Sequence, residues 1–295
     1  MQKDFIYHGR LEGIHVAFTY ALTTSIANRS VVIHDCDPVS AHLYGRALTS
    51  ALLVAQYLRP EEKYNVCWKY EGAARTVVVD VKGDNGVRGF ISPSDLSIRV
   101  EDAEELYGDS CTLAVVRSMD GRTVNAGNTR SQLQDVVDDL AFYFSYSDQV
   151  ETEMCVMIGF EADAEHPVTL CQGLMIQALP DCDLNYFQDL RTRLGREPLR
   201  SLLAQPNETD NYFEELIHAL LEDRAGEVEI ILDERPAPYL DCTCDDAKMD
   251  VVVNALPRED RLDIAQTQEA VRIHCEFCNK TFSRSASECQ RLWDQ

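Results

Sequence analysis

The sequence predicts an α+β protein with a mixed-strand N-terminal core domain, a helical linker and a small cysteine-bearing C-terminal module. Short apolar runs of strand length alternate with helical stretches up to about residue 182, without the regular alternation of a βαβ protein. Helical spacing then dominates, and four cysteines gather near the C-terminal end. A chain of 295 residues has room for about two compact units. We expect boundaries at 1–182, 183–238 and 239–295.

Strand and helix signals are mixed within the predicted core. Residues 76–81 and 87–92 flank a turn rich in glycine and asparagine, which predicts a β-hairpin. No Lys-Ser or Lys-Thr pair follows these glycines, so a phosphate-binding loop is disfavoured. Apolar residues at helical spacing predict helices over 41–58 and 129–147. Further strands are expected at 113–117, 154–160 and 172–179.

Apolar residues recur at helical spacing through the segment 183–238. One stripe contains Phe187, and a second contains Tyr212, Phe213 and Leu216. Asn211 and Glu214 are spaced like a capping box at the start of the second stripe. We expect amphipathic helices that pack on the core in the resting state, in a linker that is metastable.

The charge balance excludes two classes of partner. Acidic residues outnumber basic ones 50 to 27, which gives a formal net charge of −23. Such a surface repels phosphate backbones and anionic lipid, so we expect neither nucleic acid nor membrane as a partner. The longest apolar run, 154–160, is far shorter than a membrane span, and the first residues lack the apolar core of a secretory signal. We therefore expect a cytoplasmic protein.

Eleven cysteines are many for a cytoplasmic chain. In a reducing compartment they should be buried thiols, metal ligands or redox-active groups. Four of them lie in apolar, strand-like surroundings and are expected in the core: Cys67, Cys111, Cys155 and Cys171. Three more lie outside any strong motif: Cys36, Cys182 and Cys289.

The remaining four cysteines form two close pairs, Cys242-x-Cys244 and Cys275-x-x-Cys278, separated by thirty residues. Four thiolates are the soft, tetrahedral ligand set that zinc prefers. We predict one zinc ion per chain at these residues. A module this small has little core, so metal binding would contribute on the order of 10 kcal/mol to its folding.

The residues around the two pairs predict a compact module of helices and strands. Asp245 is placed to cap a helix that runs to about residue 255. Strands are expected at 270–274 and 280–284, with the second cysteine pair between them. Ser285 and Glu288 form a capping box for a last helix.

The pair spacing permits two interpretations. Neighbours within each pair are close enough to form the disulfides Cys242–Cys244 and Cys275–Cys278. These would remove the zinc ligands and exchange a long-range crosslink for two local ones that hold nothing together across the module. Spacing alone leaves a purely structural zinc site at least as well supported.

The two cysteine pairs, with His274 just before the second, resemble those of the bacterial redox-regulated heat-shock chaperones of thirty-three kilodaltons. The strand Gln172-Gly173-Leu174-Met175-Ile176-Gln177 and the order of core, helical linker and zinc tail extend the resemblance over essentially the whole chain.

That resemblance implies an ATP-independent holdase that is inactive when reduced and zinc-bound. Oxidation would form the two disulfides, release zinc, unfold the linker and expose apolar surface for unfolding client proteins, with dimerisation favoured. The candidate client contacts in this chain are Phe187, Tyr212, Phe213 and Leu216.

Three rival functions remain to be compared. A thioredoxin-like enzyme needs a helix that begins at the first cysteine of its motif, whereas a strand-like run follows Cys278. A nucleic-acid-binding zinc module is disfavoured because residues 239–295 carry 11 acidic and 7 basic side chains. We therefore expect no enzyme. The alternative to the chaperone is an interaction protein with a purely structural zinc module and no redox response.

Overall fold

The computed structural model describes residues 3–96, 102–207, 209 and 211–294, and the chain divides into two compact units, 1–240 and 241–295. The division falls two residues later than predicted, because Tyr239 and Leu240 pair with a strand of the first unit. Residues 183–238 lie in the same unit as the core.

The first unit contains a five-stranded sheet, here the first sheet, in the order β10-β1-β2-β9-β8. All neighbours in it are antiparallel. The strands are β1 (Phe5–Glu12), β2 (Val16–Leu22), β8 (Thr152–Phe160), β9 (Val168–Ala178) and β10 (Glu229–Arg235). Since β10 comes from the predicted linker, that segment is built into the sheet rather than only placed against it.

A six-stranded sheet, here the second sheet, has the order β11-β5-β4-β3-β6-β7. Its strands are β3 (Glu62–Tyr70), β4 (Thr76–Lys82), β5 (Gly86–Ser92), β6 (Cys111–Met119), β7 (Arg122–Ser131) and β11 (Tyr239–Leu240). The predicted hairpin is confirmed, because β4 and β5 are antiparallel neighbours on either side of a short turn. Asn85, in that turn, has a φ of 68°, a backbone region that asparagine tolerates better than most residues.

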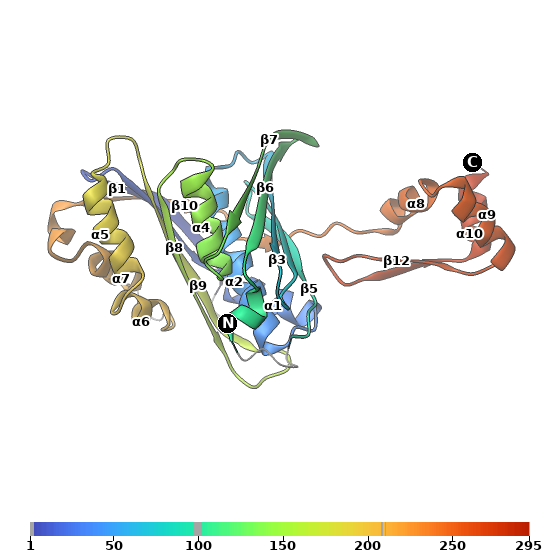
Figure 1. Ribbon diagram of the computed structural model, residues 1–295, viewed down its shortest axis with the longest axis horizontal. Helices are drawn as coiled ribbons and strands as arrows, with labels where there is room; N and C mark the ends of the chain where they lie inside the picture. Colours follow the sequence, from blue (N-terminus) through green and yellow to red (C-terminus); the bar gives the residue numbers. More distant parts are fainter. Residues whose placement is uncertain (1–2, 97–101, 208, 210, 295) are drawn as a thin grey trace. The chain divides into compact units, whose positions relative to one another are not determined.

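Helices fill the space between the two sheets (Figure 1). They are α1 (Thr24–Ile33), α2 (Pro38–Val54), the 3₁₀ helix η1 (Ala55–Tyr57) and α4 (Val136–Tyr146), with the short α3 (Ala103–Tyr107) beside the second sheet. Helix α2 begins where Asp37 accepts a hydrogen bond from the Ser40 N–H and Pro38 takes the first turn. It contacts strands of both sheets and is buried along most of its length, which explains its strongly apolar sequence.

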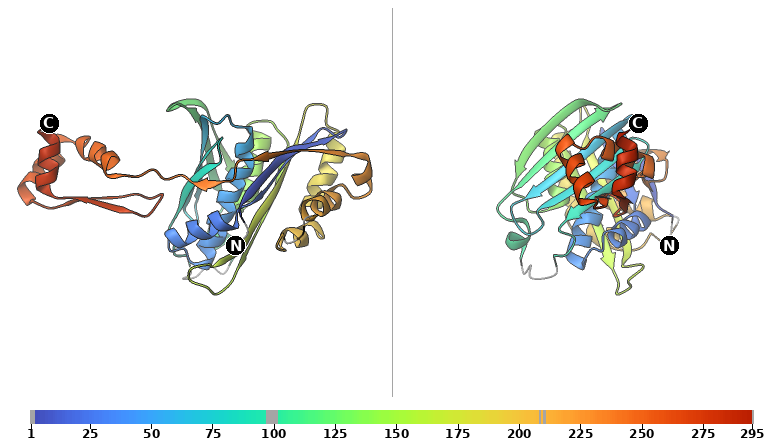
Figure 2. Two further views of the ribbon diagram at one scale, coloured as in Figure 1. Left: turned by 180° about the vertical axis from the view of Figure 1, so that it is seen from behind. Right: turned by 90° about the vertical axis from the view of Figure 1, so that its right-hand side faces the viewer.

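The helices of the predicted linker cover the opposite face of the first sheet (Figures 1 and 2). They are α5 (Leu184–Leu194), α6 (Leu199–Leu203), α7 (Tyr212–Leu221) and the 3₁₀ helix η2 (Glu222–Glu227). Their apolar stripes and the outer face of β1, β2 and β9 form a second hydrophobic core, separate from the one between the sheets. The predicted packing of these helices on the core in the resting state is therefore confirmed.

Three local predictions needed correction. The helix expected at 129–147 is shorter, because residues up to Ser131 complete β7 and the helix begins only after Asp135, which caps it. The capping box expected at Asn211 and Glu214 is wrong, since the Asn211 side chain makes no capping hydrogen bond. Cys67 is only half-buried, whereas Cys111, Cys155 and Cys171 are buried as expected.

The second unit comprises α8 (Asp246–Asn254), α9 (Arg258–Thr267), the hairpin β12 (Val271–His274) and β13 (Thr281–Arg284), and α10 (Ala286–Trp293). Both predicted caps are confirmed: Asp245 accepts from the Lys248 N–H, and Ser285 and Glu288 form a capping box. Within the described residues, no helix in either unit combines the length and apolar character that a bilayer crossing requires.

Candidate metal centre

The second unit brings the four cysteines predicted as metal ligands together; they are called the cysteine cluster below. The sulfur atoms of Cys242, Cys244, Cys275 and Cys278 all lie within 4.8 Å of one another. The Cys242 sulfur is 3.5 Å from that of Cys244 and 3.8 Å from that of Cys275, and the Cys244 and Cys275 sulfurs are 3.2 Å apart. Thirty intervening residues are therefore folded so that two local pairs meet at one point.

Local structure positions each pair. Cys242 and Cys244 lie in the extended segment just before α8, whose capping residue Asp245 fixes the direction of the chain. Cys275 and Cys278 lie in the turn between β12 and β13. That turn closes through hydrogen bonds from the Cys275 N–H to the Lys280 carbonyl and from the Asn279 N–H to the Cys275 carbonyl.

The four thiols influence one another's ionisation. Burial raises the pKa of Cys275, but hydrogen bonds from the Cys244 thiol and from the backbone N–H groups of Cys278 and Phe277 lower it to about 7. Burial and the contacts with Cys275 and Cys242 raise the pKa of Cys244. The contacts between these thiols thus favour the thiolate, the form that binds metals, at Cys275 and disfavour it at Cys244.

The geometry fits a metal ion held by four thiolates. Sulfurs bound at about 2.3 Å in a tetrahedron lie about 3.8 Å from one another, while a disulfide needs about 2.0 Å. The three separations among Cys242, Cys244 and Cys275, 3.2–3.8 Å, are close to the tetrahedral value, and Cys278 completes the set within 4.8 Å. All four residues are half-buried, so the cluster is shielded without being sealed from solvent.

The small core of the second unit agrees with a structural need for that metal. Its buried hydrophobic residues, within the part of the chain that the structure describes, are Met249, Val253, Ala286 and Cys289. A unit of about 55 residues with so little buried apolar surface depends on a further source of stability, such as a metal crosslink.

The candidate client contacts lie far from the cysteine cluster in sequence and belong to the first unit. Phe187, Tyr212 and Leu216 are buried against the first sheet, and Phe213 is half-buried in the same core. Phe213 also packs against the rings of Tyr7 and Phe18 on that sheet. Any contact with another protein through these side chains would require the helices to separate from the sheet.

Sequence reasoning missed a buried polar network that joins these helices to the sheet. The Tyr20 hydroxyl donates to Gln172 Oε1 at 2.6 Å, and Gln172 Nε2 donates to the Tyr212 hydroxyl at 2.7 Å. Tyr212 in turn donates to the Leu202 carbonyl at 2.7 Å. The sequence feature from which this network could have been predicted is Gln172, a polar residue in an otherwise apolar strand. Buried amides need such partners, so this network makes the docked position of α6 and α7 specific.

Comparisons with known proteins extend over almost the whole chain. A sequence model of the family described as "Hsp33 protein" matches residues 4–285. The "33 kDa chaperonin" of Clostridium botulinum strain Langeland is 26% identical over 292 residues, covering 97% of this chain and 96% of that protein. The corresponding protein of Clostridium perfringens strain SM101 is 24% identical over 280 residues, covering 92% and 86%.

A solved structure agrees in fold. The crystal structure of the 33 kDa chaperonin (heat shock protein 33 homolog) from Thermotoga maritima has a TM-score of 0.83, covering 99% of this chain and 98% of that chain at 20% sequence identity. It confirms the α+β fold, and the names of the relatives confirm a chaperone rather than an enzyme. The match to the family model over residues 4–285 places this chain in the Hsp33 family of chaperones.

Proposed function

We propose that this chain is a redox-regulated, ATP-independent holdase whose cysteine cluster holds one zinc ion in the resting state. The single observation that carries the proposal is the convergence of four cysteine sulfurs within 4.8 Å in a unit with a very small core. Four thiolates favour zinc over harder cations. When bound, zinc would supply a crosslink between residues 242–244 and 275–278.

Oxidation would act on the two local pairs. Cys242 and Cys244 would each lose one electron and join through a sulfur–sulfur bond, as would Cys275 and Cys278. One peroxide molecule accepts two electrons and two protons for each disulfide and leaves as two waters. The Cys242 and Cys244 sulfurs are 3.5 Å apart, so the first bond needs only a small movement. The site would then have lost its four thiolates.

Client binding would depend on the helices of the first unit that cover the first sheet. We propose that the unfolding of the second unit lets the segment 183–238 separate from the first sheet, since Tyr239 and Leu240 join that segment directly to the cysteine-bearing unit. Separation would expose Phe187, Tyr212, Phe213 and Leu216 together with the sheet face that they cover. Unfolding proteins would bind this apolar surface, and a homodimer of the oxidised chain would cover part of it.

The compartment and the net charge of the protein both fit this function. Residence in the cytoplasm would keep the thiols reduced until an oxidative stress arrives. The net charge of −23 supports unfolded proteins, rather than nucleic acid or membranes, as partners.

The alternative is a structural zinc module without a redox response, which the half-buried position of all four cysteines disfavours because oxidants can reach them.

The test measures zinc release and client protection together. Reduced protein is treated with peroxide at moderate heat, zinc is followed with a chromogenic chelator, and aggregation of a thermally unfolding client is followed by light scattering. We expect about one zinc per chain to be released as protection appears, and reductant with zinc to reverse both changes. A Cys182→Ser variant, altered at a cysteine outside the cluster, should behave in the same way. Zinc that stays bound under oxidant, with no protection gained, would contradict the proposal.

A further inference from the structure

Residues 236–240, here the latch, carry the chain from the first sheet to the second. Strand β10 ends at Arg235 in the first sheet, and β11 pairs with β5 in the second. The sequence Pro-Ala-Pro lies between the two strands, and proline restricts the backbone to extended conformations with little slack. One residue, Asp241, separates the latch from Cys242 of the cysteine cluster. The latch therefore joins the segment 183–238 to the metal site.

The turn between β4 and β5 holds the latch through one residue, Asn85. Its side chain is fully buried, and its Nδ2 donates to the Pro236 carbonyl at 2.8 Å. Its backbone carbonyl accepts from the Tyr239 N–H at 3.2 Å. Gln56 Nε2 donates to Asn85 Oδ1 at 2.7 Å and so fixes the orientation of the amide. Asn85 thus bonds both ends of the proline crossing, and a buried amide is costly to leave without such partners.

The rest of the latch packs on the core between the two sheets. Pro238 is buried, and Leu240 packs against that core. The Tyr239 hydroxyl donates to Asp84 Oδ2 at 2.8 Å on the surface. These contacts and the bonds of Asn85 are all made within the first unit, so loss of a metal from the second unit does not by itself break them.

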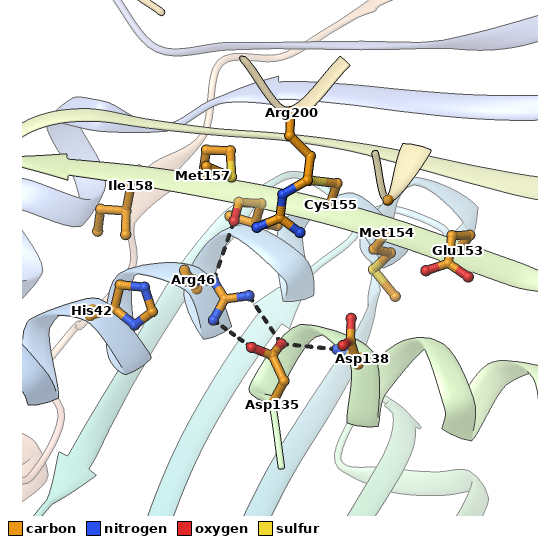
Figure 3. Close-up of a pocket in the computed structure, with 12 residues that line it drawn as sticks. His42, Arg46, Asp135, Asp138, Glu153, Met154, Cys155, Met157, Ile158 and Arg200 are labelled. Carbon is orange, nitrogen blue, oxygen red and sulfur yellow. Dashed lines mark hydrogen bonds and ion pairs between the residues drawn. The ribbon is translucent and has the colours of Figure 1, made fainter. Parts of the chain in front are cut away.

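The segment 183–238 is packed less tightly beside β8. A pocket of about 530 Å³ lies between Arg200 of α6 and residues 153–158 of that strand (Figure 3). Side chains that line such a space lose contacts that close packing would give them. Arg191 of α5 forms ion pairs with two glutamates at the start of β8, at 3.0 and 2.9 Å, but these pairs are partly exposed and contribute little. Much of the hold on the segment therefore comes from the second hydrophobic core and from the latch.

We propose that the latch, held by Asn85, controls whether unfolding of the second unit spreads to the segment 183–238. While the latch is closed, β10 is anchored at its last residue and stays paired with β1. An unfolded chain attached one residue beyond the latch gains conformational freedom when the latch opens, so loss of zinc favours opening. An open latch leaves the end of β10 free to separate from β1, and the helices before it follow. The inference rests on the proposed function and deepens it, since it names the residue that regulates release of the segment.

Amide hydrogen exchange on the zinc-loaded full chain, before and after addition of a chelator, tests the latch without a chaperone assay. The Asn279 N–H is bonded within the metal-binding turn, and the Tyr239 N–H is bonded to Asn85. The chelator should speed exchange by more than about 100-fold at Asn279 but by less than about tenfold at Tyr239. Equal acceleration at the two amides would overturn the proposal, because the latch would then be no separate barrier.

Asn85→Gly weakens the latch while glycine keeps the φ of 68° accessible. With both side-chain hydrogen bonds lost, the peroxide-treated variant should protect a client about fivefold sooner than the original chain, and zinc release should stay within about twofold. Gln134→Gly is the matched control. Gln134 has a φ of 56°, and its amide donates to the Gly108 carbonyl at 2.9 Å, outside the latch and the segment 183–238.

The control should keep the timing of the original chain, and equal timing in the two variants would exclude a regulatory role for Asn85. The redox function and the latch fail separately. A chain that releases zinc without protecting clients contradicts the holdase, whereas faster exchange at Tyr239 in the chelated Asn85→Gly chain than in the chelated original still supports the latch.

Discussion

At the scale of single residues, four thiols provide the chemistry of the second unit. The Cys278 side chain shares its cluster with three other sulfurs, all within 4.8 Å. A hydroxyl in place of one thiolate is a poor ligand for a soft metal ion. Each of the four cysteines is therefore expected to be necessary for tight metal binding.

We expect Cys278→Ser to lower zinc affinity by more than about 100-fold, which exceeds the effect of changing residues that only orient the ligands. Zinc content after dialysis, measured with a chromogenic chelator, should fall from about one per chain to a small fraction. Cys182→Ser, at a half-buried cysteine of the first unit, is the matched control and should retain its zinc. Full zinc content in the Cys278→Ser protein would mean that this residue is not a ligand.

A second prediction concerns a single hydroxyl. The Tyr212 hydroxyl accepts from Gln172 Nε2 and donates to the Leu202 carbonyl, both at 2.7 Å. Tyr212→Phe removes both of these hydrogen bonds, although the Leu202 carbonyl still accepts from the Gln205 N–H, and we expect the free energy of unfolding to fall by about 1 kcal/mol. Urea unfolding of the reduced protein measures the change.

The matched control is Tyr186→Phe. The Tyr186 hydroxyl is buried and has no hydrogen-bond partner among the described residues, although the same helical segment carries it. Its removal should change stability by less than about 0.5 kcal/mol. Equal losses in both variants would show that the polar network contributes nothing specific.

At the scale of secondary-structure elements, the docking of β10 against β1 is expected to depend on pH. His8 of β1 lies opposite Asp233 of β10, hydrogen-bonds Thr19 of β2 and packs against the Tyr57 ring of η1. Burial, followed by the positive charge of Arg235, lowers the pKa of His8 to about 4. In the unfolded chain this pKa returns to about 6.5, so protonation favours unfolding as the pH falls from about 6.5 towards 4.

We therefore expect His8→Gln to reduce the acid sensitivity of the first unit. Between about pH 7.5 and pH 4.5 the variant should lose about 1–2 kcal/mol less stability than the original chain, because glutamine does not titrate. Thermal unfolding at both pH values gives the comparison, with each protein referred to its own stability at the higher pH. Parallel losses in the two proteins would exclude a role for His8.

At the scale of the whole molecule, the two units should respond separately to metal removal. The first unit has two extensive hydrophobic cores, whereas the second has very few buried apolar side chains. A chelator should therefore unfold residues 241–295, while the core between the two sheets stays folded even where the segment 183–238 separates from the first sheet.

The chain's two tryptophans report on the two units. Trp68 is fully buried in the first unit, and its indole N–H donates to the Val136 carbonyl at 3.0 Å. Trp293 lies in the second unit and donates to the Val253 carbonyl at 3.1 Å. In single-tryptophan variants, a chelator should shift the Trp293 emission to longer wavelength and leave that of Trp68 unchanged. A simultaneous change in both would show that the two units unfold together.

Several features of this protein followed from local sequence alone. The cysteine pairs, the caps at Asp245 and Ser285, and the hairpin of β4 and β5 depend on residues close together in the chain. Helical spacing likewise predicted α2, α5 and α7, because an amphipathic or buried helix carries its periodicity within a few turns. These features could therefore be predicted before any tertiary contact was known.

Tertiary structure decided which distant segments meet. No local pattern pairs β10 with β1 or leaves β8 at the end of the first sheet, since strand order depends on contacts between residues far apart in the chain. The same holds for Gln172 and Tyr212, and for Arg46, which donates to the Val156 carbonyl. By itself the sequence determined the ligand set and most of the helices, whereas folding in three dimensions decided the docked surface and the pocket, because both are made of segments that only long-range packing brings together.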